Sequence, residues 1–221
     1  MPVDRSFYVD HLYPLQDRVL RLIDMLDTGF YLTGGTALSR AYLKHRVSDD
    51  LDLFVNYDPQ FGIWSGLIVD MLLRQDDLQT IVVMRQQHFV RLLVAMGDVT
   101  LKVEMVNDVP SHVGEVRRHP QLGRIDSPEN ILANKLTALI SREEPRDLAD
   151  VWGLCIRLGL SIREAVEGVA GKAVGIYPPE LARRLCTATA QDWQQVMWLD
   201  PPNVDAYLSD LVRLGDDLLL V

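Results

Sequence analysis

Apolar and polar positions follow two different periods along the chain, and these periods separate a mixed first half from a helical second half. Apolar residues recur at helical spacing over 12–28 and 60–75, which predicts two amphipathic helices. Short apolar or β-branched runs predict strands over 30–33, 50–55, 78–84, 89–96 and 99–106. Residues 107–125 show no clear period, and we expect a crossing segment there.

The second half carries helical patterns throughout. Ser127-Pro128-Glu129 is a helix start signal, with serine at the cap and proline at the first helical position. Further helices are predicted from Pro145, from Ser161, from Pro178 and over 204–220. The pattern therefore predicts an α/β domain over residues 1–113 and a helical domain over 114–221.

A glycine turn interrupts the first half after the strand at 30–33. Gly34 and Gly35 allow a sharp turn and a close approach of the backbone to a ligand. Thr36 is a candidate cap for the short helix that follows, so that free N–H groups would point at one spot. Such a turn suits a phosphate, whereas a plain structural turn is the simpler interpretation of the glycines alone.

Acidic residues alternate with apolar ones in two of the predicted strands. Period 2 places Asp50 and Asp52 on one face of their strand and the leucines on the other. Glu104 lies on the polar face of the strand at 99–106, so three carboxylates converge if the two strands are neighbours. Mg²⁺ prefers such oxygen ligands. The structural alternatives are a solvated edge strand for the aspartates and a surface ion pair between Glu104 and Lys102.

Charged residues also lie beside the apolar stripe of the predicted helices in the second half. Lys135 lies near the edge of that stripe, and Asp147 and Asp150 occupy the first turn of the next helix at i,i+3 spacing. A short connection after Arg142 brings Lys135 and Asp147 within reach of each other. A lysine that extends to water and an aspartate that complements the helix dipole are the alternative interpretations.

Composition narrows the class of protein. The chain has 221 residues, of which 48% are hydrophobic and 24% charged, and its net charge is −9. The acidic balance disfavours a broad surface that coats nucleic acid, although a local basic patch is compatible with it. With two cysteines, no secretion signal and no apolar run long enough for a membrane span, we expect a cytoplasmic protein with no membrane partner.

In their order, these motifs resemble the AbiEii/AbiGii nucleotidyltransferase-toxin family, which includes MenT-like toxins. The resemblance rests on Gly34-Gly35-Thr36-Ala37-Leu38, His45-Arg46, Ser48, Asp50-Leu51-Asp52-Leu53, Lys102-Val103-Glu104-Met105-Val106, Lys135-Leu136-Thr137-Ala138-Leu139, Arg142 and Arg146-Asp147-Leu148-Ala149-Asp150. It implies an α+β fold, namely a nucleotidyltransferase-type mixed sheet with flanking helices followed by a C-terminal helical bundle that closes a cleft.

The resemblance also implies a role for each matching position. The nucleotide-binding residues would be Gly34, Gly35, Thr36, Arg46, Ser48, Lys135 and Arg142. The catalytic residues would be Asp50, Asp52, Glu104, Lys135 and Asp147, of which Asp50, Asp52 and Glu104 would bind Mg²⁺ or Mn²⁺. The family usually has aspartate as its third acid. Because Glu104 reaches one methylene further, activation of the acceptor hydroxyl is a second role open to it.

Two functions follow as hypotheses. The first is a nucleotidyltransferase that moves an NMP from an NTP to an acceptor hydroxyl and serves as the toxin of a toxin–antitoxin pair with a cognate antitoxin. The acceptor is left open between an RNA such as the tRNA 3′ end, a protein hydroxyl and a small molecule. The second is a catalytically silent module on the same scaffold that binds a nucleotide or a partner. The presence of Asp50, Asp52, Glu104 and Lys135 favours the enzyme.

Overall fold

The computed structural model describes residues 5–168 and 177–219, and the chain folds into two compact units. The sheet unit comprises Met1–Ala37, Val47–Pro110 and Glu115–Asp126, and the helical unit comprises Leu38–Arg46, Ser111–Gly114 and Ser127–Val221. Leu38–Arg46 therefore belongs with the helices and Glu115–Asp126 with the sheet, although both lie on the other side of the division expected at residue 113.

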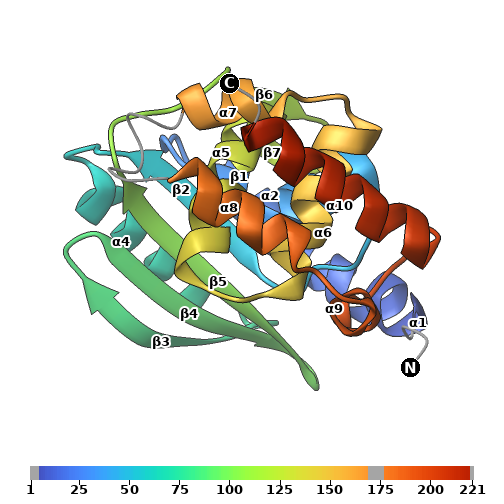
Figure 1. Ribbon diagram of the computed structural model, residues 1–221. Coiled ribbons are helices and arrows are strands. Elements are labelled where there is room, and N and C mark those ends of the chain that lie inside the picture. The colour runs from blue at the N-terminus through green and yellow to red at the C-terminus, as the bar shows by residue number, and fades with distance from the viewer. Residues whose placement is uncertain (1–4, 169–176, 220–221) are drawn as a thin grey trace. The chain divides into compact units, whose positions relative to one another are not determined.

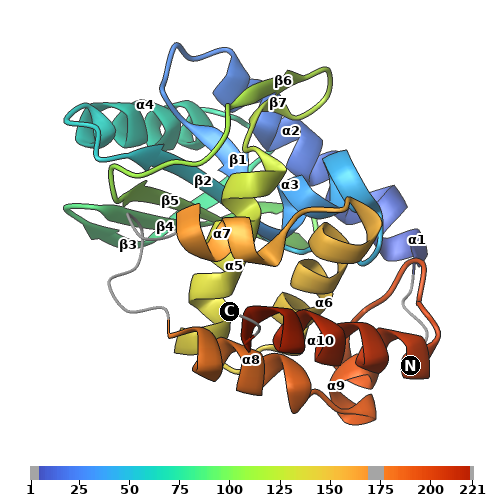
Figure 2. The same ribbon diagram turned by 45° about the horizontal axis from the view of Figure 1, so that its top comes forward.

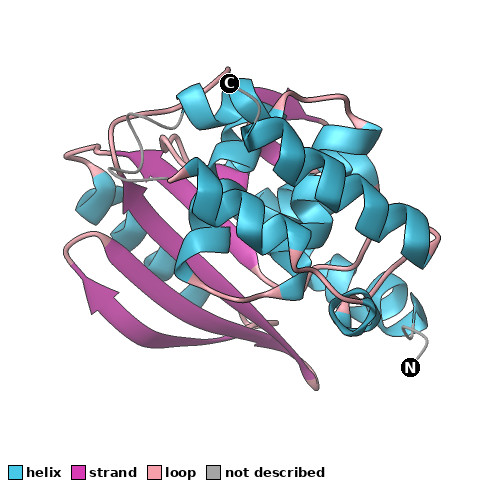
Figure 3. Ribbon diagram, in the orientation of Figure 1, coloured by secondary structure: helices cyan, strands magenta, loops and turns pink. Residues whose placement is uncertain are grey.

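Seven strands form one mixed sheet in the order β3-β4-β5-β2-β1-β7-β6, drawn in magenta in Figure 3. The strands are β1 (Tyr31–Thr33), β2 (Leu51–Asn56), β3 (Gln79–Gln86), β4 (Phe89–Met96), β5 (Val99–Asp108), β6 (Arg117–His119) and β7 (Gly123–Ile125). The pairs β2–β5 and β1–β7 are parallel, and the other neighbours are antiparallel. The five strands predicted from the sequence are confirmed, and β2 and β5 are neighbours.

The last two strands correct the expectation of a crossing segment over 107–125. β6 and β7 form a hairpin there, and β7 pairs with β1 through Leu32 and Ile125. Each strand has three residues, which is too short to show an alternating period. Gly123 supplies the positive φ of +73° at the end of the hairpin turn.

Alternation in the central strands separates a buried apolar face from a polar face. In β5, Leu101, Val103 and Met105 are fully buried, whereas Lys102 and Glu104 are half-buried. Helices α2 (Tyr13–Asp24) and α4 (Phe61–Leu73), labelled in Figure 1, belong to this unit. Helix α2 contacts β5, and α4 contacts β3. The N-terminal turns α1 (Arg5–Phe7) and η1 (Tyr8–Leu12) precede α2. The face of β2 and β5 that carries the acids is thus fixed by the apolar residues on the opposite face.

The edge strand β3 is unusual because apolar side chains are exposed on both of its faces. Ile81 is 62% exposed and Val83 49%, and Val82 and Met84 are exposed as well. A β-bulge interrupts the pairing with β4 between Val82 and Met84. Bulges of this kind are one way in which edge strands avoid further pairing.

The helical unit consists of helices that the sequence largely predicts. They are α5 (Pro128–Ser141), α6 (Pro145–Trp152), the π-helical turn η3 (Gly153–Arg157), α7 (Ile162–Gly168), α8 (Pro178–Cys186), α9 (Ala190–Gln195) and α10 (Val204–Leu219). Ser127 caps α5, where its hydroxyl accepts a hydrogen bond from the Asn130 amide at 3.0 Å. Helix α9 was not predicted, although Thr189 and Asp192 form its capping box. Residue 220, expected in the last helix, lies outside the described residues.

No helix in residues 5–168 and 177–219 has the length and apolar character needed to cross a membrane.

Close packing of α8 against α10, visible in Figure 2, gives a prediction about stability. A Cβ at Gly215 of α10 would lie 2.5 Å from Cys186 Sγ and 3.0 Å from the Ala182 carbonyl oxygen. We expect Gly215→Ala to lower the free energy of unfolding by about 1–3 kcal/mol, measured by urea denaturation. The control Gly62→Ala adds a Cβ with nothing within 4 Å and should raise stability by up to ~1 kcal/mol. Equal stability of the two variants would contradict this packing.

Candidate active site

The glycine turn of the sheet unit lies against the acidic strand. β1 ends at Thr33, and α3 (Gly34–Ala37) begins at the next residue with Gly34 at a φ of +66°. Thr33 pairs with Asp52 in the β1–β2 register. A Cβ at Gly34 would lie 2.3 Å from Asp52 Oδ2, so the position requires glycine for its backbone conformation and for this close approach.

Thr36 has a different local role from the one predicted. It lies inside α3 rather than at a cap, and its hydroxyl donates a hydrogen bond to the Asp50 carbonyl. The side chain is fully buried. Thr36 therefore holds the backbone that leads into β2, and through it the position of Asp50.

Three carboxylates and two cations share the polar face of β2, β5 and β4. The members of this acidic face are Asp50, Asp52, Glu104, Lys102 and Arg91. Asp52 and Glu104 are directly opposite in the parallel β2–β5 register. Lys102 Nζ lies 2.9 Å from Asp50 Oδ2 and 3.5 Å from Glu104 Oε1, and Arg91 Nε lies 2.6 Å from Glu104 Oε1. The expected ion pair of Glu104 with Lys102 is thus present together with a shared face for the acids.

The carboxylates determine the charge state of Lys102. Burial disfavours its ammonium, but the hydrogen bond to Asp50 and the negative charges of the three carboxylates outweigh burial and raise the pKa of Lys102. Lys102 is therefore a fixed positive charge at neutral pH. In the absence of a metal ion it offsets much of the mutual repulsion of the acids.

A divalent metal fits part of this face. Within the described ranges, no three His, Cys, Asp or Glu side chains are grouped so as to hold a metal ion. Mg²⁺, however, commonly takes only one or two carboxylates and completes its shell with water and substrate phosphates. Asp50 and Asp52 provide two hard oxygen donors of this kind, and Asp52 lies at the glycine turn. Glu104, the expected third ligand, is bound to Arg91 and Lys102 in this structure.

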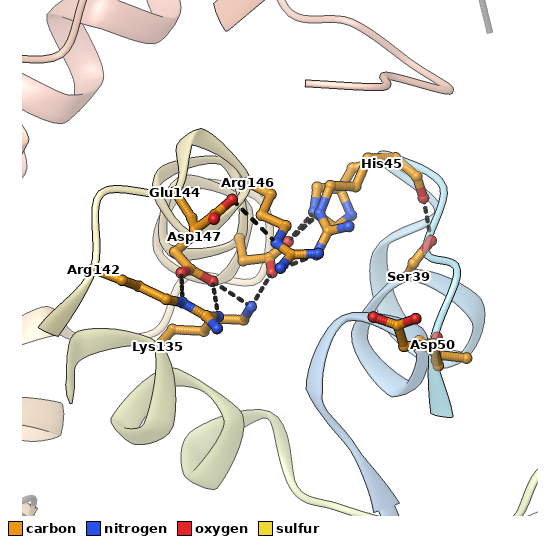
Figure 4. Close-up of polar contacts among 11 residues, drawn as sticks. Ser39, His45, Asp50, Lys135, Arg142, Glu144, Arg146 and Asp147 are labelled. Atoms are coloured by element: carbon orange, nitrogen blue, oxygen red, sulfur yellow. Dashed lines mark hydrogen bonds and ion pairs between the residues drawn. The ribbon is translucent and has the colours of Figure 1, made fainter. Parts of the chain in front are cut away.

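A second cluster of charges lies in the helical unit, with all members but one buried, and Figure 4 shows it around Lys135 and Asp147. We call its six side chains the charge network: His45, Arg46, Lys135, Arg142, Asp147 and Asp150. Lys135 comes from α5, the two aspartates come from α6, and His45 and Arg46 follow the π-helical turn η2 (Leu38–Leu43).

Asp150 is the centre of the charge network. Its fully buried carboxylate accepts two hydrogen bonds from Arg46, both at 2.7 Å, and one from His45 Nε2 at 2.8 Å. Lys135 Nζ lies 2.7 Å from Oδ2 of the same carboxylate. Burial alone would raise the pKa of Asp150, but the charges of Arg46 and Lys135 and these hydrogen bonds hold it well below its usual range.

Asp147 shares Lys135 with Asp150. Lys135 Nζ donates to Asp147 Oδ1 at 2.6 Å, which confirms the predicted reach between these two residues. Arg142 donates from Nε at 2.7 Å and from a terminal nitrogen at 3.1 Å. Burial opposes ionisation, but the charge of Lys135 and the bonds from Arg142 and Lys135 outweigh it and lower the pKa of Asp147.

His45 is the neutral member of the charge network. Burial lowers its pKa despite its contact with Asp150. Because an ionised Asp150 can only accept, the proton of neutral His45 lies on Nε2. Nδ1 is buried without a hydrogen-bond partner among the described residues. Three positive charges, on Lys135, Arg46 and Arg142, therefore face two negative ones.

Two further predicted nucleotide-binding residues, Arg46 and Ser48, have partners within the protein. Arg46 is 5% exposed, and its guanidinium is bound to Asp150, while Ser39 donates to its carbonyl. Ser48 is half-buried, and its carbonyl accepts a hydrogen bond from Gln16 Nε2 at 3.1 Å.

The contact of His45 with Asp150 could not be predicted from the sequence. No local pattern links the two residues, since 105 positions separate them.

The strand, glycine turn and short helix, with two acids at the neighbouring strand, agree with the nucleotidyltransferase class that the family comparison shows. The chain belongs to the family described as "Nucleotidyl transferase AbiEii toxin, Type IV TA system", whose profile matches residues 21–197. It is therefore a nucleotidyltransferase-family toxin of a type IV toxin–antitoxin system. No curated protein matches it by sequence.

Solved structures confirm the α+β fold. MenT4, a nucleotidyltransferase toxin of Mycobacterium tuberculosis, aligns with a TM-score of 0.64 at 15% identity over 99% of this chain and 86% of its own. JHP933 of Helicobacter pylori aligns with a TM-score of 0.59 at 19% identity over 99% and 93%. Another Helicobacter pylori structure, described as a nucleotidyltransferase, aligns with a TM-score of 0.59 at 20% identity over 93% of both chains.

The contact between Gly34 and Asp52 leads to a matched pair of variants. Gly34 and Gly97 have positive φ angles of +66° and +60°, but a Cβ at Gly97 meets nothing within 4 Å. Both alanine variants should lose about 1 kcal/mol of stability through backbone strain. Only Gly34→Ala should also displace Asp52 and abolish metal-dependent binding of a labelled NTP, measured by filter binding. Retained binding in Gly34→Ala would show that this approach has no role in the site.

Burial of neutral His45 predicts a pH dependence of stability. The folded pKa lies below the ordinary value of 6.5, so the unfolded chain binds more protons as the pH falls below 6.5. Stability should therefore decrease over that range, whereas Asp147 and Asp150 stay ionised there. Urea denaturation between pH 5 and 8 should show a smaller decrease for His45→Gln than for the wild type. The exposed control His88→Gln should keep the wild-type slope, and an equal slope in all three proteins would refute the assignment.

Proposed function

We propose that the protein transfers an NMP group from an NTP to an acceptor hydroxyl with the help of a divalent metal, and that Asp50 and Asp52 hold that metal. In this transfer the acceptor oxygen loses its proton and forms a bond to the α-phosphorus, the bond between the α-phosphorus and the α–β bridging oxygen breaks, and pyrophosphate leaves. The observation that carries the proposal is the approach of Gly34 to Asp52 Oδ2, which puts a sharp backbone turn directly beside a carboxylate. A triphosphate needs backbone donors and a cation close together. Within the sheet unit, this arrangement offers a backbone turn that a phosphate can approach and a carboxylate that can hold the cation.

Each residue of the sheet unit then has a task in positioning. Gly34 and Gly35 allow the triphosphate to approach the start of α3. Asp52 and Asp50 orient the metal, and Thr36 fixes the backbone at Asp50. When bound, Mg²⁺ or Mn²⁺ would neutralise the phosphate oxygens and stabilise the charge that develops during the transfer. Little covalent work is left for the chain, because phosphoryl-type transfers depend mainly on positioning and electrostatics.

For the helical unit we propose a role in binding phosphate. Lys135 uses two of its three N–H donors on Asp147 and Asp150, which leaves one donor for a substrate oxygen. Arg142 is about half exposed, so that part of its guanidinium is accessible. In this proposal Asp147 is a positioning residue that orients both cations. Arg46 supports the charge network instead of touching the nucleotide.

For the acceptor we propose an RNA, with the tRNA 3′ end as the first candidate. The resemblance to the AbiEii/AbiGii family, some of whose toxins block translation by acting on an RNA such as the tRNA 3′ end, supports this choice. Membership of a type IV toxin–antitoxin family supports a cognate antitoxin. The net charge of −9 favours a narrow contact with an RNA end over a broad electrostatic surface. A protein hydroxyl and a small molecule are the other acceptors that the experiment below includes.

The test is incubation of the protein with each NTP labelled in its α-phosphate, Mg²⁺ and, in separate reactions, tRNA, total RNA, protein extract and a protein-free extract of small molecules. We expect label to be transferred from one or more NTPs, and Asp52→Asn to reduce this transfer at least about 100-fold because a metal ligand is lost. Asp98→Asn, in the exposed β4–β5 turn, should retain wild-type activity. Metal-dependent binding of the NTP with no transfer to any acceptor would identify the catalytically silent module instead. Absence of both would refute the proposed function.

A further inference from the structure

One cation of the acidic face contacts a carboxylate that is proposed above to hold the metal ion. The ammonium of Lys102 is 2.9 Å from Asp50 Oδ2, the distance of a direct charge-assisted hydrogen bond. Asp50 is one of the two carboxylates proposed to hold the metal. Lys102 is itself about one-third exposed, so it is neither sealed in the core nor a free surface lysine.

The sheet register makes this contact a built-in feature of the fold. Leu51 is opposite Val103 in the parallel β2–β5 pairing, so the residues before them, Asp50 and Lys102, are brought side by side. Lys102 and Glu104 lie on the same face of β5 because they are two positions apart. The pairing of the two strands therefore places the lysine between the carboxylates of Asp50 and Glu104.

An ammonium and a divalent cation compete for the same carboxylate. Both would bind the Asp50 carboxylate, on which the lysine already contacts Oδ2, and their like charges repel each other at the short distances involved. Glu104 offers the lysine an alternative, since its Oε1 is 3.5 Å from Lys102 Nζ. Glu104 is in turn fixed by Arg91 Nε at 2.6 Å, so it stays in place as the lysine moves.

We propose that Lys102 is an internal counter-ion that occupies Asp50 before the metal binds and passes to Glu104 when the metal enters. This inference rests on the proposed function. Lys102 is a positioning residue: it keeps Asp50 oriented in the free protein and weakens metal binding by competition. Glu104, held by Arg91, accepts the lysine after it leaves Asp50. The additional methylene of a glutamate at this position extends its carboxylate towards the lysine.

The experiment is a titration of the purified full-length protein with Mn²⁺, followed by electron paramagnetic resonance of the free ion. Lys102→Met removes the charge and keeps the length of the side chain, and its Kd for Mn²⁺ should be about fivefold lower than that of the wild type. Lys102→Arg, which keeps the charge, should bind close to the wild-type value. The control Lys44→Met removes an exposed lysine and corrects for the change in net charge.

A double-mutant cycle locates the effect. In the background of Asp50→Asn, the further change Lys102→Met should alter the Kd little, because the competition for Asp50 is already absent.

Thermal unfolding gives a second readout: without metal, Lys102→Met should have a lower Tm than Lys44→Met, and saturating Mg²⁺ should raise its Tm by more.

The outcomes separate this inference from the proposed function. If the wild type binds Mn²⁺ and Asp52→Asn loses that binding, the metal site stands. An unchanged or higher Kd in Lys102→Met, relative to Lys44→Met, would then overturn the counter-ion role alone. If the wild type and Asp52→Asn bind Mn²⁺ equally, the proposed metal site itself fails, and this inference fails with it.

Discussion

The approach of the Gly34 backbone to the Asp52 carboxylate is the constraint around which the sheet unit is built. It requires β1 to end at Thr33, beside Asp52 on β2, and the next residue to have a left-handed backbone conformation. It also leaves no room for a Cβ. The apolar face of the sheet keeps both strands in register, because a shift by one residue would turn Asp52 towards the core. The position of one carboxylate thus depends on the packing of the whole sheet.

The helical unit depends on an interaction of another kind, a carboxylate with no exposed surface. Asp150 is tolerated in the interior only because Arg46, His45 and Lys135 contact it together. Loss of one partner from such a cluster commonly costs about 3–5 kcal/mol, since the remaining charge stays buried. Arg46 and His45 come from the segment that follows η2, so the charge network also ties that segment to α5 and α6.

Most of the fold could be predicted from periodicity, but the contacts within the site could not. The alternation in β2 and β5 indicated that Asp52 and Glu104 lie on polar faces, and their pairing in register follows the same pattern. β6 and β7 were missed because three residues show no period. The contacts of Asp150 could not be predicted, because its partners His45 and Arg46 are more than 100 positions away. The position of Lys102 between two acids depends on strand register, which a single strand does not reveal.

The division of the chain into two units limits how the protein can be truncated. The backbone passes from one unit to the other after residues 37, 46, 110, 114 and 126. A truncation at any single point therefore leaves one unit short of a segment: a fragment that ends at residue 113 lacks β6 and β7 and retains Leu38–Arg46, which belongs to the helices. Neither unit can therefore be obtained complete by a single truncation. A protein that contains all of one unit needs linkers in place of the segments that belong to the other unit.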